Sequence, residues 1–183
     1  MRFVETPLKG LFVIEADPFR DARGVFARVF CENELRSIGH TKKIVQVNNS
    51  VTCAQGALRG MHYQRPPFDE IKIVKCLKGR VFDVAVDMRA GSATFLNWYG
   101  VELSEDRMNS LYIPEGFAHG FQTLEENCSL IYLSTGFYSA AHECGVRFDD
   151  PRVRIKWPLP VGEVSKKDGA VPCITDDFKG VVI

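Results

Sequence analysis

The sequence lacks a surplus of charge of either sign. Lys and Arg together number 23, Asp and Glu together also number 23, and no block of like charge interrupts the chain. Without a basic surplus nothing favours nucleic acid as a partner, and without a charged block nothing indicates an interaction tail. We therefore expect the partner to be a small molecule.

Long hydrophobic runs are also missing. The first residues, MRFVETPLKGLFVIEADPF, contain only a short apolar run that Lys9 and Gly10 break. No later stretch approaches the roughly 18 apolar residues of a membrane-spanning helix, and the start lacks the apolar region of a signal peptide. These absences predict a cytoplasmic protein without a membrane partner.

Paired cysteines are the third absence. The six cysteines are scattered singly, without any C-x-x-C pair, and several lie inside apolar runs. This spacing is untypical of a zinc site or a disulfide framework. We expect reduced, buried thiols at all six positions, which are Cys31, Cys53, Cys76, Cys128, Cys144 and Cys173.

What the sequence does have is an apolar content of 45% over 183 residues, which fits a single domain spanning residues 1–183. Apolar residues alternate with polar ones in short segments rich in β-branched and aromatic residues. The segment 32–39 (ENELRSIG) is the clearest short helix, closed by Gly39, and 158–183 reads as a carboxyl-terminal arm. Strands are expected within 19–30, 43–51, 81–88, 97–103, 110–116 and 128–135. Many short strands in one domain predict an all-β jelly roll with a few short helices.

Two motifs refine this fold prediction. Gly56, His62, Gln64, Glu70 and Gly79 follow the outline of the first cupin motif, and PEGFAH (114–119) follows the core of the second. Together they predict a cupin jelly-roll sandwich. A metal-binding cupin uses two histidines and a carboxylate from the first motif, but the second histidine position is Gln64, and an amide is a poor ligand for such metals. The metal-ligand set is therefore incomplete.

The chain resembles the dTDP-4-dehydrorhamnose 3,5-epimerase family, the RmlC-like cupins, over roughly residues 18–168. Several motifs in a fixed order are far more specific than any one alone. Those that carry the resemblance are FRDARGVF, VQVNNS, ALRGMHYQ, KGRVFDVAVDMR, IPEGFAHGF, YLSTGFYSAAHECGVRFDDP, IKWP and SKKD. The family inverts C3 and C5 of a nucleotide-linked 4-keto-6-deoxyhexose. Both protons are acidic because both carbons flank the C4 ketone, so inversion needs a base, an acid on the other face, and a cation or donor at the enolate oxygen.

The resemblance implies four catalytic residues. His62 would be the base, oriented by Asp168, and Tyr132 would be the opposite acid. Lys72 would stabilise the enolate oxygen, and its strand parity with Glu70 and Val74 predicts that it points inward whereas Lys75 points outward. From the residues alone, a hydrogen-bonded core histidine, a solvated strand-edge lysine and a core tyrosine remain the alternatives.

The resemblance also implies a substrate-binding set. Arg23 and Arg59 would hold the diphosphate, as guanidinium groups do well, although a surface charge is the alternative for each. Tyr138 would stack on the nucleotide base. The remaining implied binding residues are Gln46, Asn48, His119, Phe26 and Glu143.

The family reading thus implies a cofactor-free, metal-free epimerase that forms a homodimer by sharing amino-terminal strands. Three alternatives stay open at this stage. The enzyme could invert only C3 or only C5, on a dTDP, CDP or GDP sugar. The chain could instead be a metal-dependent cupin oxygenase or isomerase, or a non-catalytic sugar-binding cupin.

Overall fold

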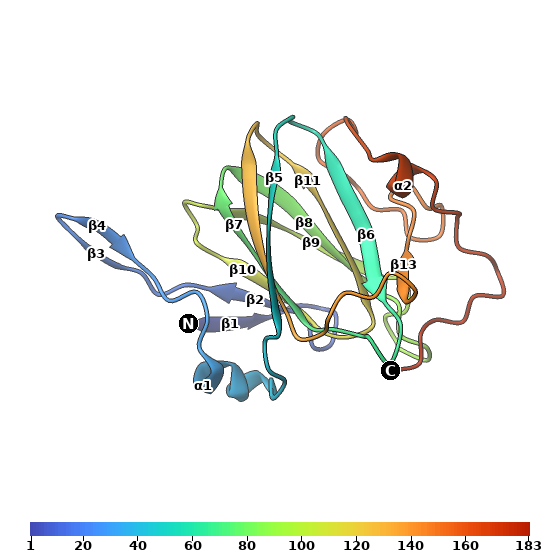
Figure 1. Cartoon of the computed structure of the whole chain (residues 1–183), viewed down its shortest axis with the longest axis horizontal. Coiled ribbons are helices and arrows are strands. Elements are labelled where there is room, and N and C mark those ends of the chain that lie inside the picture. The colour runs from blue at the N-terminus through green and yellow to red at the C-terminus, as the bar shows by residue number, and fades with distance from the viewer.

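A computed structural model describes the whole chain, residues 1–183, as a sandwich of two antiparallel sheets (Figure 1). The six-stranded sheet has the order β1 (Arg2–Glu5), β2 (Phe12–Glu15), β10 (Ser110–Ile113), β7 (Lys72–Lys78), β12 (Cys128–Ser134), β5 (Gln46–Thr52). The five-stranded sheet has the order β13 (Glu143–Gly145), β6 (Leu58–Gln64), β11 (Phe117–Thr123), β8 (Arg80–Asp87), β9 (Trp98–Ser104). The predicted all-β sandwich is confirmed.

Because side chains alternate along each strand, every second side chain points into the space between the two sheets. From the six-stranded sheet, Val74, Leu111 and Leu130 point inward, and they meet Ala85 and Phe121 of the five-stranded sheet in a fully enclosed cluster. Packing of two such faces is what holds a sandwich together. Towards β5 the inward positions become polar, so the space between the sheets changes there from a core into a cavity.

The outer face of the six-stranded sheet is covered near the amino terminus. The predicted helix is α1 (Glu32–Leu35) followed by the 3-10 turn η1 (Arg36–Ile38), and Gly39 ends it with a φ of 82°. Leu35 packs against Ile73 and Tyr112 on this face. Neither α1 nor α2 (Lys166–Gly169) exceeds one turn, and no helix is long and apolar enough to cross a membrane.

One expectation about side-chain placement needs correction, and a second is confirmed. All six cysteines are free, but only Cys76 and Cys128, on strands, are buried, whereas Cys53 and Cys173 lie in loops and are exposed. Lys75 points to the outer face as predicted, where it is 7% exposed and its Nζ donates to the Met108 carbonyl. Burial lowers the pKa of Lys75.

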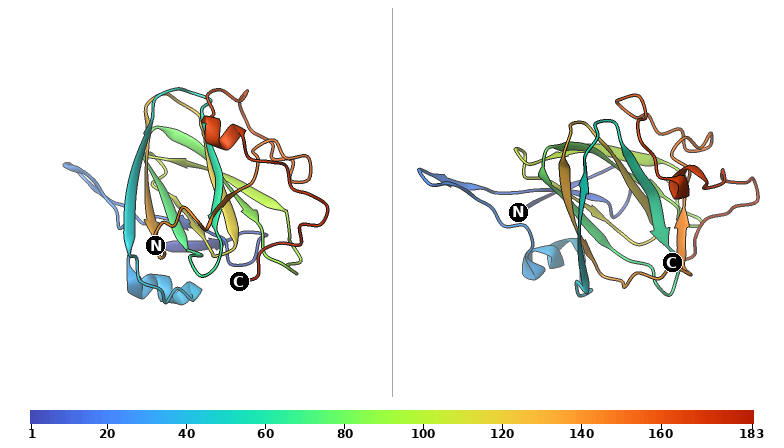
Figure 2. Two further views of the ribbon diagram at one scale, coloured as in Figure 1. Left: turned by 45° about the vertical axis from the view of Figure 1, so that its right-hand side comes forward. Right: turned by 45° about the horizontal axis from the view of Figure 1, so that its top comes forward.

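The amino-terminal strands divide into two groups. β1 and β2 pair within the chain's own six-stranded sheet, next to β10. The hairpin of β3 (Phe19–Asp21) and β4 (Gly24–Phe26) pairs only with itself and extends away from the body in every view (Figures 1 and 2). Its apolar side chains are open to solvent, with Phe19 63% and Phe26 74% exposed.

The carboxyl-terminal arm folds back onto the five-stranded sheet. A parallel bridge joins Leu58 to Val164, and a second joins Arg89 to Val181. Between the bridges, Ile174 and Phe178 pack against the apolar cluster on the outer side of this sheet. The arm thereby brings α2 beside β6, which holds His62 (Figure 1).

Candidate active site

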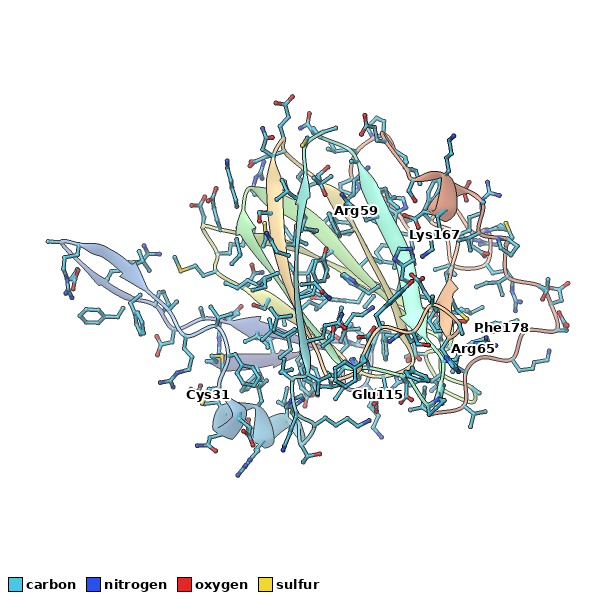
Figure 3. The ribbon with its side chains drawn as sticks, in the orientation of Figure 1. Cys31, Arg59, Arg65, Glu115, Lys167 and Phe178 are labelled. Carbon is cyan, nitrogen blue, oxygen red and sulfur yellow. The ribbon has the colours of Figure 1, made fainter.

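A cavity of about 610 Å³ opens between the two sheets where the inward side chains are polar. Arg59 and Lys167, labelled in Figure 3, both line it. Ten of the twelve residues implied by the family resemblance belong to the lining, and these are His62, Asp168, Tyr132, Lys72, Arg59, Gln46, Asn48, His119, Tyr138 and Glu143.

Two glycines bring the histidine strands together. In the β6–β11 ladder His62 lies opposite His119. A Cβ atom on Gly60 would lie 2.6 Å from the His119 carbonyl oxygen, and one on Gly120 would lie 2.5 Å from the Arg59 carbonyl oxygen. Gly60 also has a φ of 103°, which favours glycine. Neither position can hold a side chain without separating the strands.

His62 is paired with a carboxylate from the other end of the chain. Its Nε2 lies 2.6 Å from Asp168 Oδ1, and Asp168 is 4% exposed. The Asp168 backbone N–H donates to Ser165 Oγ, which caps α2, and Asp168 Oδ2 accepts from the Gly60 N–H. A carboxylate at Nε2 favours the tautomer with the proton on Nε2, so Nδ1 keeps the lone pair of a base.

A second histidine–carboxylate pair lies deeper in the same wall. His119 Nε2 is 2.9 Å from Asp83 Oδ2, and Asp83 is fully buried on β8. Burial raises the pKa of Asp83, while His119 and Lys72 oppose that rise. The sequence reading missed Asp83, although a carboxylate in phase with the buried Val81 and Ala85 was the available signal.

Tyr132 and Lys72 lie on the opposite wall, the six-stranded sheet. The Tyr132 hydroxyl is 3.0 Å from Ser50 Oγ, and its ring meets the His119 ring edge-on at 6.1 Å. Burial raises the pKa of Tyr132 despite the Ser50 hydrogen bond, so the phenol keeps its proton at neutral pH. Lys72 Nζ lies 3.2 Å from Glu70. Tyr132 is in phase with Leu130 and Ser134, as predicted.

The rim of the cavity gathers charged and aromatic groups. The Tyr138 hydroxyl donates to Glu143 Oε2 at 2.8 Å, and Lys167 Nζ donates to the same oxygen at 2.5 Å. This ion pair raises the pKa of Lys167. On the other side, Arg59 Nε donates to Thr52 Oγ1. Sequence reasoning missed Lys167, whose position one residue before Asp168 in SKKD was the only signal.

Arg23 and Phe26 are not at this cavity. Both belong to the β3–β4 hairpin, where Arg23 pairs with Asp21 at 2.6 Å and its side chain is 88% exposed. Within a single chain they do not reach the cavity, because the hairpin extends away from the body that holds it (Figure 2), and their implied substrate-binding role stays a prediction.

The residues at the cupin metal positions each have another partner. His62 is bonded to Asp168, His119 to Asp83, and Glu70 to Lys72, while both polar atoms of the Gln64 amide bind backbone groups. No three His, Cys, Asp or Glu side chains come together in a cluster that could hold a metal ion. The arrangement suits proton transfer between two walls.

Comparison with known proteins agrees with this chemistry. Residues 5–176 match the family described as dTDP-4-dehydrorhamnose 3,5-epimerase. The enzyme of that name from Sinorhizobium fredii is 38% identical over 96% of this chain and 91% of its own. The crystal structure of the Elizabethkingia anophelis epimerase has a TM-score of 0.92 and 39% identity, covering 97% of this chain and 98% of its own. The Legionella pneumophila RmlC structure, in complex with dTDP-4-keto-L-rhamnose, has a TM-score of 0.90 and 38% identity, covering 94% and 92%. By its two motifs, its sandwich and these similarities, the chain belongs to the dTDP-4-dehydrorhamnose 3,5-epimerase family.

Proposed function

We propose that His62 and Tyr132 carry out the epimerase reaction on a dTDP-4-keto-6-deoxyhexose held between the two sheets. The observation that supports this most is their placement on facing walls of one cavity, with a carboxylate on His62 and a protonated phenol on Tyr132. Inversion requires proton removal from one face and return to the other. One sheet supplies a base and the other an acid.

The reaction begins when His62 takes the proton from the carbon beside the ketone. Asp168 stabilises the resulting imidazolium, since the two groups are 2.6 Å apart and Asp168 is buried. The electron pair moves onto the C4 oxygen, where the ammonium group of Lys72 offsets the developing negative charge. Tyr132 then gives its proton to the opposite face of the carbon, and the ketone re-forms.

Five further lining residues serve the nucleotide, and a sixth borders the sugar. Arg59 is exposed at the rim and offers a guanidinium fork to the diphosphate. His119, Gln46 and Asn48 provide further polar groups, and the exposed ring of Tyr138 offers a face for the base. Glu143, close to Lys167 and Tyr138, borders the sugar end near His62.

The test is proton NMR of dTDP-4-keto-6-deoxyglucose with the protein in deuterated water. We expect deuterium to enter at both C3 and C5 with inversion of both, because one base and one acid can serve each carbon in turn. Uptake at a single carbon would identify a mono-epimerase. Binding without any uptake would show a sugar-binding protein and overturn the proposal.

We further propose a homodimer in which each β3–β4 hairpin completes the cavity of its partner. The hairpin displays Phe19, Phe26 and Arg23 to solvent, and the outer face of β5 exposes Val47 and Val51. Apolar surface of this kind is typical of a protein interface. In this arrangement Arg23 and Phe26 of each chain would bind the substrate in the cavity of the partner chain.

The free thiols suit the reducing cytoplasm.

Subunit mixing tests the shared site. We expect Arg23→Ala and His62→Ala homodimers each to have little activity, and their co-expressed mixture to regain it. In the mixed dimer one cavity holds an intact His62 and receives an intact Arg23 from the other chain. Lack of any recovery in mixed dimers purified through two different tags would place the hairpin outside the active site.

A further inference from the structure

The loop that holds Tyr138 is fastened by Gln64, a residue with no part in the proposed reaction. Gln64 lies on β6, two residues after His62, and is 5% exposed. Its Nε2 donates to the Phe137 carbonyl at 3.1 Å and to the Phe68 carbonyl at 2.9 Å. Its Oε1 accepts from the Ser139 N–H at 2.6 Å. Both N–H groups and the oxygen of the amide are thus used by two loops.

Side-chain packing contributes little to holding this loop in place. The side chains of Phe137 and Tyr138 are 64% and 58% exposed, so neither packs into a core. Gln46 on the other sheet adds one bond, since its Oε1 accepts from the Tyr138 N–H at 3.2 Å. Glu143 accepts from the Tyr138 hydroxyl, and Ser139 bonds to His142 within the same loop. Of the side-chain bonds to the backbone of residues 137–139, Gln64 makes two and Gln46 makes one.

Gln64 has no donor left for a ligand. An amide side chain has two N–H donors, and both already reach backbone carbonyls. A direct contact with the sugar would therefore require one loop to be released. Gln64 occupies the position at which a metal-binding cupin has its second histidine ligand. In this protein the side chain at that position binds the 137–139 loop instead of a metal.

We propose that Gln64 is a positioning residue that sets the place of Tyr138 over the cavity and thereby the affinity for the nucleotide. This inference rests on the proposed function, in which the Tyr138 ring stacks on the base. It acts on binding and leaves proton transfer to His62 and Tyr132.

The test is Gln64→Leu, which removes all three hydrogen bonds at similar volume. We expect the Kd for dTDP, measured by calorimetry, to rise about ten-fold, as the loss of more than one ordered hydrogen bond would give. Deuterium uptake at saturating dTDP-4-keto-6-deoxyglucose should change by less than about two-fold, because the loss concerns ground-state binding. Gln55→Leu is the matched control, since Gln55 also bonds to a backbone carbonyl, that of Leu124, but lies away from the cavity.

A double-mutant cycle with Tyr138→Ala tests whether Gln64 affects dTDP binding through Tyr138. If Gln64 acts through Tyr138, the double variant should bind dTDP no more weakly than Tyr138→Ala alone. Gln64→Glu, which keeps the acceptor for Ser139 but sets a carboxylate against two carbonyls, should weaken dTDP binding too and serves if Gln64→Leu is poorly folded. Additive losses, or unchanged affinity in a folded Gln64 variant, would overturn the inference. An unchanged affinity in Tyr138→Ala would instead remove the stacking role from the proposed function, and the inference with it.

Discussion

His62→Ala should lose both deuterium uptake and inversion, at C3 and at C5. No enolate can form without the base, and we expect no substitute from His119, whose side chain is 6% exposed, against 32% for His62. General bases contribute about 10²- to 10⁴-fold to such reactions, so we expect a loss within or above that range. The measurement is proton NMR in deuterated water, with uptake and configuration followed at each carbon.

Binding provides the control for this variant. The affinity of His62→Ala for dTDP should stay close to that of the unchanged protein, because Arg59, Gln46 and Tyr138 are untouched. A loss of dTDP binding would indicate a disturbed cavity rather than a missing base. Uptake at the normal rate, with the cavity intact, would mean that another residue removes the proton.

Tyr132→Phe should separate exchange from inversion. His62 can still remove the proton, exchange it with solvent and return it to the same face. Deuterium should therefore enter the sugar with its configuration retained, while inversion falls by about 10²- to 10⁴-fold through loss of the general acid. Exchange and epimerisation, coupled in the unchanged protein, would then have different rates in the same NMR experiment.

Tyr112→Phe is the matched control for the acid. Tyr112 lies on β10 of the same sheet, but its hydroxyl is near His40 Nδ1 on the outer face, at 3.2 Å. The same loss of a hydroxyl there should leave inversion unchanged. Normal inversion in Tyr132→Phe would assign the acid to another group. Complete loss of exchange in that variant would contradict the assignment of base and acid to separate walls.

Local patterns predicted many of the strands, and the family resemblance implied ten of the residues that line the cavity. The period-two alternation placed Tyr132 in phase with Leu130, and it placed Lys72 on the inner face with Val74. Both assignments depend only on the two-residue repeat of a strand, which the sequence contains directly. The two motifs identified His62 and His119, which the β6–β11 ladder sets opposite each other.

What the sequence did not predict depends on contacts between distant segments. Asp83 reads as one polar residue in an apolar strand until β11 brings His119 beside it. Ser50 gains its importance only from the β5–β12 pairing, which sets it near Tyr132. The position of Arg23 could not be predicted for another reason, since alternation indicates that a segment is extended but not where a hairpin points.

The pairing of His62 with Asp168 has a consequence for how the protein becomes active as it is made. The two residues are 106 positions apart, and the carboxylate arrives with the arm that closes over a finished five-stranded sheet. A growing chain can therefore assemble both walls, with Tyr132, Lys72 and His119 in place, before its base has a counter-charge. Competence to react therefore requires α2, which is synthesised after the strands of both walls.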